Sequence, residues 1–391
     1  MSDGWETRLI HPTRHAPEGF RSLVPGVFRA STTLYETVAE AQDAERRGKP
    51  YEYGLSGTPT TLELAAWIAE LEGAHHTVIA PGGLAAILLV NLAFLGAGDH
   101  VLFPDSVYGP SRALADDVLR RFGVEVAYYD ALCGAGIAHY LRDRTRLVWC
   151  ESPGSIGMEV QDVPAIVTVA HAAGVVVALD NSYASGVLFD AFAHGVDVSI
   201  QALSKYAGGH SDLLLGSVSV RDAEHQERVA RTHRVLGMGV SPDECSLALR
   251  GMQTLAVRLA HVESATLTVA RHLVGKPHVE RVLHPALASC PGHETWKRDF
   301  SGSASPFSFV FDAGISRERV NAFVERLRYF KIGASWGGVT SLAMAYRHIV
   351  RGERDYGDRT VRLNVGLERA QDLIADLDTS LASLSSVVSG I

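Results

Sequence analysis

The chain has 391 residues, which is about two to four times the usual length of a single domain and predicts two domains with sizeable cores. Hydrophobic residues make up 47% and charged residues 20% of the sequence, as in ordinary soluble globular enzymes. The formal net charge of -8 at pH 7, without any extended run of Lys or Arg, argues against a surface built to bind nucleic acid.

Nothing in the sequence indicates a membrane segment or a disulfide framework. The longest apolar stretch, Leu84–Leu95, is interrupted by Asn91 and is too short to span a bilayer, and the first 14 residues lack an apolar signal core. The four cysteines are scattered without a CxxC pair, which suits a reducing compartment. We therefore expect a cytoplasmic protein.

Alternating helical and β-rich segments follow an N-terminal part that we expect to be irregular up to about Gly57. Thr60 and Thr61 are expected to cap a first helix that ends at Gly73. β-rich runs are then predicted at residues 77–80, 100–103, 124–128, 147–150, 175–179, 198–203 and 213–220, with helical patterns between them such as 165–173. Continuous apolar strands separated by helices predict an α/β domain with a mostly parallel sheet covered on both faces.

The C-terminal part reads as a smaller α+β domain. Helices are predicted at 246–259, 264–273, 317–328 and 367–377, and a strand at 307–311. We therefore divide the chain into an N-terminal arm (1–57), a large domain (58–251) and a small domain (252–391).

Three of the predicted strands are followed by residues that can carry chemistry. Gly82 and Gly83 form a turn before a helix, where backbone N–H groups can hold a phosphate, although such turns are often plain connections. Asp180 ends an apolar strand and can simply cap the next segment. Lys205 follows another apolar strand, where it can be a nucleophile or can extend its ammonium group into solvent.

Taken together, these three features predict one cofactor, since the carboxyl ends of parallel strands meet at one edge of a sheet. A phosphate cradle, an amine and an acid fit pyridoxal 5′-phosphate (PLP). The dinucleotide, P-loop and zinc-protease motifs are absent, and the 17 histidines show no metal-ligand spacing, so no metal is expected. An NAD-dependent oxidoreductase and a catalytically inactive relative stay open as alternatives.

Six longer stretches carry a resemblance to a known family. They are Glu151–Ile166, Leu179–Phe189, Asp197–Asp212, Gly292–Ser303, Ser335–Gly338 and Val361–Glu368. Between about Tyr51 and Asp378 the chain resembles the Cys/Met-metabolism family of fold-type-I PLP enzymes. The sequences ESPGS and SWGG look like its bacterial cystathionine β-lyase branch.

The resemblance implies a role for each matching position. Lys205 would form the Schiff base with PLP and act as the catalytic base, and Asp180 would pair with the ring nitrogen. Tyr108 would stack on the ring, while Gly83 and Leu84 (through N–H groups) and Ser204 (through its hydroxyl) would bind the phosphate. Substrate binding would fall to Arg362, which would grip the α-carboxylate, and to Ser335 and Trp336.

The family resemblance also implies a reaction and an assembly. β-Elimination from cystathionine or a related cysteine thioether would give a thiol, pyruvate and ammonia, with homocysteine as the thiol in methionine biosynthesis. Cysteine desulfhydrase, S-alkylcysteine lyase, γ-lyase and γ-synthase activities remain alternatives. A homotetramer of two dimers is implied, in which Tyr53 of the arm reaches the active site of a neighbouring subunit and contacts the cofactor there. Tyr53 and Tyr108 would tune the proton transfers.

Four positions depart from the family pattern at one end of the expected substrate pocket. The arm reads Tyr53-Gly54-Leu55-Ser56 where the relatives usually carry Tyr-Gly-Arg-Arg. Ala113 and Ala334 replace an aspartate and a tyrosine that are often present. These changes predict a roomier, more apolar pocket, unless neighbouring Arg112 replaces part of the lost charge.

Overall fold

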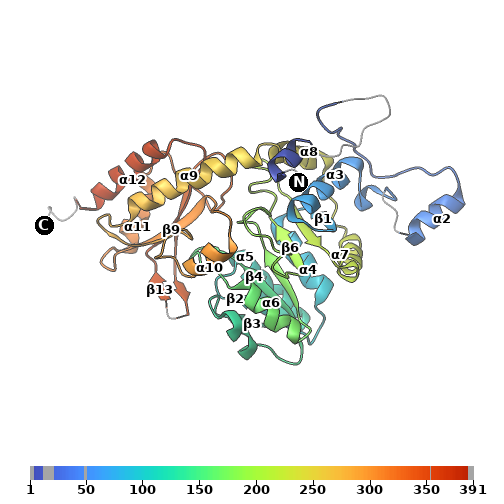
Figure 1. Ribbon diagram of the computed structural model, residues 1–391, viewed down its shortest axis with the longest axis horizontal. Helices are drawn as coiled ribbons and strands as arrows, with labels where there is room; N and C mark the ends of the chain where they lie inside the picture. The colour runs from blue at the N-terminus through green and yellow to red at the C-terminus, as the bar shows by residue number, and fades with distance from the viewer. Residues whose placement is uncertain (1–3, 12–21, 48–50, 353, 386–391) are drawn as a thin grey trace.

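The computed structural model describes residues 4–11, 22–47, 51–352 and 354–385. Within these residues the chain builds two main β-sheets side by side, the larger from the N-terminal half and the smaller from the C-terminal half, and a two-stranded hairpin (Figure 1). The sheets lie on either side of the expected division at residue 251, which supports that division as a proposal.

The larger sheet has seven strands in the order β1-β7-β6-β5-β4-β2-β3. Their bounds are β1 His76–Ala80, β2 His100–Pro104, β3 Glu125–Tyr129, β4 Thr145–Glu151, β5 Val176–Asp180, β6 Val198–Gln201 and β7 Gly216–Val220. The mostly parallel sheet is confirmed, and only β7 runs antiparallel to its neighbours β1 and β6. The segment between β6 and β7 contains no helix, so the chain returns beside the strand it has just left.

Helices cover both faces of this sheet. One buried cluster joins α3 (Pro59–Glu72), α6 (Val163–Ala172) and α8 (Pro242–Met252), and another joins α4 (Gly83–Phe94) and α7 (Ala223–Val235). The short helix α5 (Gly109–Ala113) follows β2. The capping expectation for α3 was wrong by two residues. Thr58 is the cap: its hydroxyl accepts the Thr61 N–H while Thr61 bonds back to Thr58, and the helix ends at Gly73 as predicted.

The smaller sheet has the order β10-β11-β14-β9-β8. Its strands are β8 Val279–Leu283, β9 Pro306–Phe311, β10 Lys331–Ile332, β11 Leu342–Tyr346 and β14 Thr360–Asn364. The helices α9 (Leu255–Leu273), α11 (Arg317–Arg326) and α12 (Ala370–Ser385) bury a third apolar cluster against it. The predicted helices 246–259 and 264–273 are corrected to α8 and one long α9, because the helical conformation is interrupted at residues 253–254 and not between 259 and 264.

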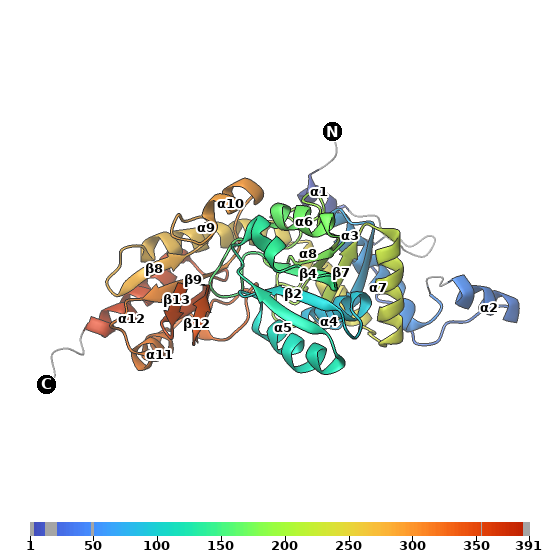
Figure 2. The ribbon, with the colours of Figure 1, turned by 90° about the horizontal axis from the view of Figure 1, so that it is seen from below.

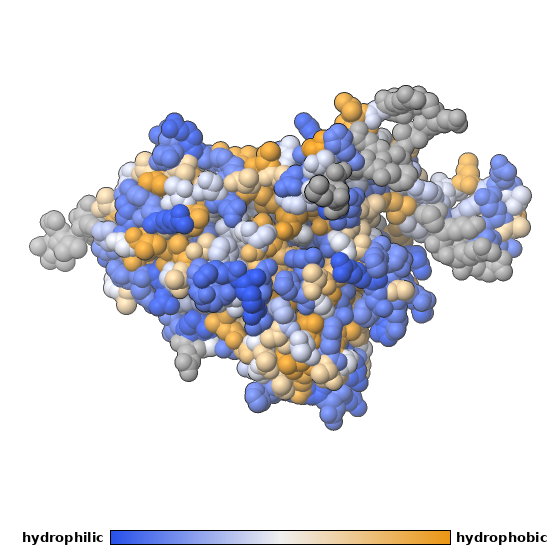
Figure 3. All heavy atoms as spheres, viewed as in Figure 1, coloured by the Kyte–Doolittle hydropathy of each residue, from blue (hydrophilic) through white to orange (hydrophobic). Residues whose placement is uncertain are grey.

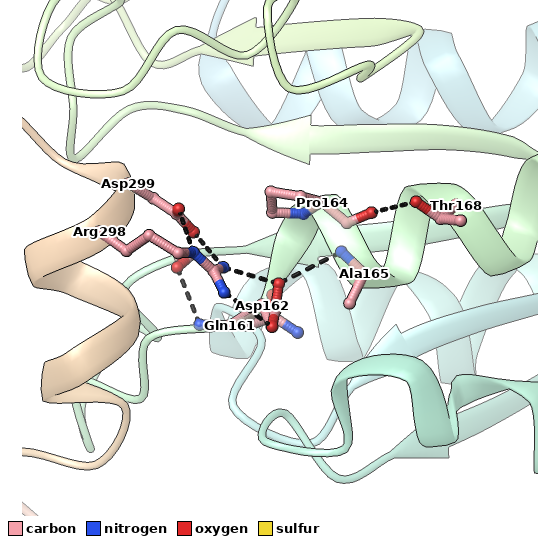
Figure 4. A network of polar contacts seen from close by, with 8 residues as sticks. Gln161, Asp162, Pro164, Ala165, Thr168, Arg298 and Asp299 are labelled. Atoms are coloured by element: carbon pink, nitrogen blue, oxygen red, sulfur yellow. Dashed lines mark hydrogen bonds and ion pairs between the residues drawn. The ribbon is translucent and has the colours of Figure 1, made fainter.

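Two smaller units adjoin this sheet. Strands β12 (Ile349–Arg351) and β13 (Arg354–Gly357) form a hairpin, and α10 (His293–Asp299) faces α6. Arg298 of α10 donates to Asp162, which also caps α6 by accepting the Ala165 N–H (Figure 4). Arg298 thereby connects the C-terminal half of the chain to a helix of the larger sheet.

The N-terminal segment is not wholly irregular as expected. It contains α1 (Trp5–Ile10) and α2 (Val38–Arg47), and α2 lies well away from the rest of the chain (Figures 1 and 2). Leu34, between them, is 93% exposed. On the face seen in Figure 3, hydrophobic and hydrophilic side chains are interspersed. Across the described residues, no helix combines the length and apolar character needed to cross a membrane.

Candidate active site

A cavity of about 390 Å³ lies between the two sheets, where β4, β5 and β6 end. Most of the predicted site residues line it, from both halves of the chain. They are Gly83, Leu84, Tyr108, Asp180, Ser204 and Lys205 from the larger-sheet half, and Trp336 and Arg362 from the smaller-sheet half. The fold therefore brings together residues up to 279 positions apart (83 to 362).

Lys205 lies in the turn after β6, and its amine faces the loop that carries the SWGG sequence. Nζ lies 2.8 Å from Oγ of Ser335 and 5.5 Å from the centre of the Trp336 ring. Gly337 packs on the Lys205 main chain so closely that a Cβ at this residue would lie 3.0 Å from the Lys205 carbonyl carbon. Burial, followed by the charge of Arg362, lowers the pKa of Lys205, while Asp180 opposes the shift. An amine with a lowered pKa is more readily available as a base or nucleophile.

A buried hydrogen-bond network holds the Lys205 turn against the smaller sheet. The hydroxyl of Tyr206 lies 2.7 Å from that of Ser305 and accepts the Ser305 N–H. The Ser305 hydroxyl donates to Oδ1 of Asn364, which also accepts the Gly337 N–H at 3.1 Å. The positions of the amine and of the SWGG loop are therefore fixed by the same side chains.

Two carboxyl groups end neighbouring strands on the floor of the cavity. Asp180 ends β5 and Glu151 ends β4, and the two residues are register partners. Burial raises the pKa of both groups, and for Glu151, whose pKa is well above its usual range, the charge of Asp180 adds to the effect. Glu151 was not predicted as a site residue. Its position at the end of a buried strand, like that of Asp180, was the signal that could have revealed it.

The turn after β1 presents the N-terminus of α4 to the cavity. Gly83 is required there, because a Cβ would lie 2.7 Å from Cβ of Ala202. The first N–H groups of a helix have no partner within the helix and favour an anion. Ser204 also lines the cavity, but its hydroxyl donates to the Leu215 carbonyl and accepts the Leu215 N–H, so its expected bond to a phosphate stays a prediction.

Arg362, on β14, is 5% exposed, and two main-chain carbonyl groups orient its guanidinium. One terminal nitrogen donates to the Ser155 carbonyl at 2.9 Å and the other to the Ala334 carbonyl at 2.6 Å. The guanidinium also lies 5.1 Å from the centre of the Tyr346 ring. A guanidinium has five N–H donors, so donors remain for a carboxylate in the cavity.

The predicted arm residues do not reach this cavity within one chain. Tyr53 is half exposed and pairs with Thr32 through an isolated β-bridge. Leu55 and Ser56 line a different cavity, of about 250 Å³, against α3 and α7. Ala113 is exposed on α5 and does not line the main cavity, whereas Ala334 does.

Arg112 does not line the main cavity within one chain. Its guanidinium lies 3.7 Å from the centre of the Tyr128 ring and donates to the Asp105 carbonyl. The described residues also contain no cluster of three or more His, Cys, Asp or Glu side chains that could hold a metal ion.

The cavity suits PLP in shape and chemistry. The close fit of Gly83 leaves the helix N-terminus open to an anion, a partly buried acid and a partly buried amine line the cavity, and Tyr108 offers an aromatic ring. An acid beside a ring nitrogen and an amine within reach of an aldehyde are the two groups that this cofactor needs.

Comparisons with known proteins agree with this fit. Residues 6–382 match the family of Cys/Met metabolism PLP-dependent enzymes. The chain is 46% identical to a putative cystathionine beta-lyase of Rhizobium johnstonii (98% of this chain, 97% of the relative) and 39% identical to the cystathionine beta-lyase MetC of Escherichia coli (97% and 98%). The crystal structure of cystathionine gamma synthase from Xanthomonas oryzae pv. oryzae in complex with aminoacrylate and cysteine superposes with a TM-score of 0.90 at 28% identity, covering 99% of this chain and 100% of that one.

These matches confirm the predicted cofactor and remove the NAD-dependent alternative. They also confirm the fold, since the solved relative aligns over both sheets. The chain belongs to the Cys/Met metabolism family of PLP-dependent enzymes.

Proposed function

We propose that the protein is a PLP-dependent carbon–sulfur β-lyase that acts on cystathionine or a related cysteine thioether, giving a thiol, pyruvate and ammonia. The observation that carries the proposal is the convergence of the Lys205 amine, the Asp180 carboxyl and the Arg362 guanidinium on one cavity. The choice of β-elimination is supported by the relatives of 46% and 39% identity that are named cystathionine beta-lyases.

In this proposal Arg362 binds the substrate carboxylate and places the α-carbon beside Lys205. Bound PLP supplies an electron sink for the negative charge that develops at the α-carbon. Lys205 removes the α-proton, and its ammonium form then protonates the departing sulfur. The hydroxyl of Ser335, 2.8 Å from Nζ, and the ring of Trp336 keep the amine in the cavity between these two steps.

Tyr108 would stack on the cofactor ring and border the reacting atoms. Burial, and then the negative charge of Asp180, raise the pKa of Tyr108. Its side chain therefore stays a neutral phenol, which can donate a hydrogen bond but is not a base. The N–H groups of Gly83 and Leu84 and the hydroxyl of Ser204 would hold the phosphate.

We further propose that the active enzyme is a homotetramer made of two dimers, located in the cytoplasm. Tyr53 is half exposed and lies outside its own chain's cavity, as a residue that serves a neighbouring subunit would. The four cysteines are all unpaired, which suits a reducing compartment.

A substrate panel scored for two products tests the proposed function. Purified enzyme is supplied with L-cystathionine, L-cysteine, S-methyl-L-cysteine and L-methionine, and pyruvate and 2-oxobutyrate are quantified, with Lys205→Ala as the control. Pyruvate from a cysteine thioether supports β-elimination. 2-Oxobutyrate as the main product from cystathionine would identify a γ-lyase, and neither product would favour a γ-synthase.

A further inference from the structure

Tyr108, the residue before helix α5, is held by the carboxyl group of Glu151 at the end of β4. The main-chain N–H of Tyr108 donates to Oε2 of Glu151 over 2.7 Å. Glu151 is 8% exposed and lines the main cavity together with Tyr108. Since Tyr108 precedes the first turn of α5, this bond fixes the point from which the Tyr108 side chain enters the cavity.

The main chain of Glu151 is itself anchored in the interior. Its N–H donates to Oε1 of Gln161 over 2.7 Å, and the amide nitrogen of Gln161 donates to the buried Tyr129 hydroxyl. The carboxyl group is therefore held on a rigid part of β4, while Tyr108 lies in a loop and is 39% exposed. Glu151 is the fixed partner of the two, and Tyr108 is the one that it positions.

The neighbours of Glu151 favour its neutral form. Asp180 is its register partner on β5, and two carboxylates confined side by side repel each other. The hydrogen bond from the Tyr108 N–H acts in the opposite direction, as do the positive charges of Arg351 on β12 and Arg362 on β14. Burial and Asp180 outweigh these effects and raise the pKa of Glu151. A neutral carboxyl still accepts the Tyr108 N–H through its carbonyl oxygen.

We propose that Glu151 is a positioning residue, which acts as an uncharged hydrogen-bond acceptor for the Tyr108 main chain and thereby holds the Tyr108 ring against the cofactor. This inference rests on the proposed role of Tyr108 in binding PLP. Of the two register partners Glu151 and Asp180, the proposal assigns the negative charge to Asp180.

Two variants of similar size separate the acceptor from the charge. Glu151→Gln keeps an acceptor oxygen and removes the ionisable group, whereas Glu151→Met keeps the length and removes the oxygen. The dissociation constant of PLP, measured by dialysis of purified holoenzyme, should rise at least tenfold in Glu151→Met and return to within threefold of wild type in Glu151→Gln. Glu125→Gln, at an exposed site on β3, is the matched control.

A double-mutant cycle tests whether Glu151 acts through Tyr108. In the Tyr108→Ala background, Glu151→Met should weaken PLP binding by less than threefold further. Fully additive effects would overturn the proposal, as would a Glu151→Met enzyme that binds PLP like wild type or a Glu151→Gln enzyme as weak as Glu151→Met. If Tyr108→Ala alone leaves PLP binding unchanged, the proposed role of Tyr108 fails, separately from its bond to Glu151.

Hydrogen exchange keeps the proposal testable if Glu151→Met does not fold. The Tyr108 amide should be protected to a similar degree in wild-type and Glu151→Gln holoenzyme, because both supply an acceptor. Fast exchange of this amide in either protein would overturn the proposal.

Discussion

The amine of Lys205 and the hydroxyl of Ser335 lie 2.8 Å apart, although 130 positions separate them in the chain. Reduction of the holoenzyme with borohydride should place the phosphopyridoxyl label on Lys205. Lys205→Ala should abolish turnover and leave thermal unfolding of the apoenzyme almost unchanged, since one amine contributes little to a core of this size. Peptide mapping by mass spectrometry checks the label, and a label on another lysine would contradict the assignment.

The lowered pKa of Lys205 predicts how PLP recombines with the apoenzyme. Only the neutral amine attacks an aldehyde, so the rate of recombination should rise with pH as Lys205 loses its proton. Because burial and Arg362 lower the pKa of this group, the half-maximal rate should fall below pH 10.5, the ordinary value for lysine. Stopped-flow absorbance from pH 6 to 11.5 measures the profile, and a half-maximal rate at or above pH 10.5 would contradict the prediction.

Activity should depend on the sharing of Tyr53 between subunits. We expect Tyr53→Phe and Lys205→Ala each to be strongly impaired, and mixed dimers to contain one intact site of two. Random exchange makes about half of the dimers mixed, so about a quarter of the wild-type sites should be regained. Activity is measured after subunit exchange, which differently tagged chains verify. Absence of any recovery in verified mixed dimers would exclude a shared site.

Substrate choice should favour cysteine thioethers with uncharged substituents over cystathionine. Leu55 and Ser56 provide no charge, and Arg112 is engaged by Tyr128 and Asp105. A charge-assisted hydrogen bond contributes ~1.5–3 kcal/mol, so Leu55→Arg should raise kcat/KM for cystathionine by roughly tenfold or more. Steady-state kinetics on L-cystathionine and S-benzyl-L-cysteine test this, with Leu55→Met as the control. A wild-type preference for cystathionine of tenfold or more, without gain from Leu55→Arg, would refute it.

Two adjacent glycines should differ in their tolerance of a methyl group. Gly83→Ala places Cβ 2.7 Å from Cβ of Ala202, whereas a Cβ on Gly82 meets no atom within 4 Å. Overpacking of this kind costs about 1–3 kcal/mol, and it shifts the helix end that we expect to bind phosphate. Urea unfolding of the apoenzymes and PLP dissociation constants should show Gly83→Ala to be the more damaged. Equal stability of the two variants would contradict this reasoning.

The bond between Asp162 and Arg298 should contribute stability only above acidic pH. Burial alone would raise the pKa of Asp162, but the bonds from Arg298 and the Ala165 N–H outweigh it and hold the pKa below 3.8. The carboxylate therefore stabilises the fold above pH 3.8, and this contribution is lost as the pH falls through the folded-state pKa. Asp162→Asn keeps the helix cap, so it should lower the free energy of unfolding by about 0.2–1 kcal/mol at pH 7.

The same comparison at lower pH provides the check on Asp162. The difference in urea unfolding between wild type and Asp162→Asn should shrink as the pH is lowered to 3.5. The exposed Asp143→Asn should have no effect at either pH. A difference that grows with acidity would reverse the sign of the argument.

Local patterns in the sequence predicted the strands but not how they run or meet. All seven strands of the larger sheet were predicted, because buried parallel strands are continuous apolar runs. The direction of β7 was not, because an apolar run is the same in either direction. The true cap Thr58 and the helices α1 and α2 were missed, since several polar residues offer similar capping signals and short polar helices have no apolar stripe.

An active-site residue could be predicted when its neighbours in the sequence indicated its role, and could not when that role depends on contacts with distant residues. Asp180 and Lys205 could be chosen from the strand ends alone. Arg362 was chosen only through the family resemblance, because its burial depends on carbonyl groups of Ser155 and Ala334 that lie far away in the sequence. Glu151 has the same strand-end signal as Asp180, but its contact with Tyr108 could not be predicted, because that hydrogen bond spans 43 positions.

The network that joins Tyr206, Ser305 and Asn364 has a consequence for how such enzymes can exchange segments. A chimera could join the residues up to α9 of this chain to the C-terminal part of a relative. Each half of such a chimera would have evolved in contact with a different second half. The chimera would place its lysine correctly only if the incoming segment brings the Ser305 hydroxyl and the Asn364 amide to the same positions. Recombination between relatives is thus constrained at three side chains, and a library of chimeras sorted on these positions should be enriched in active members.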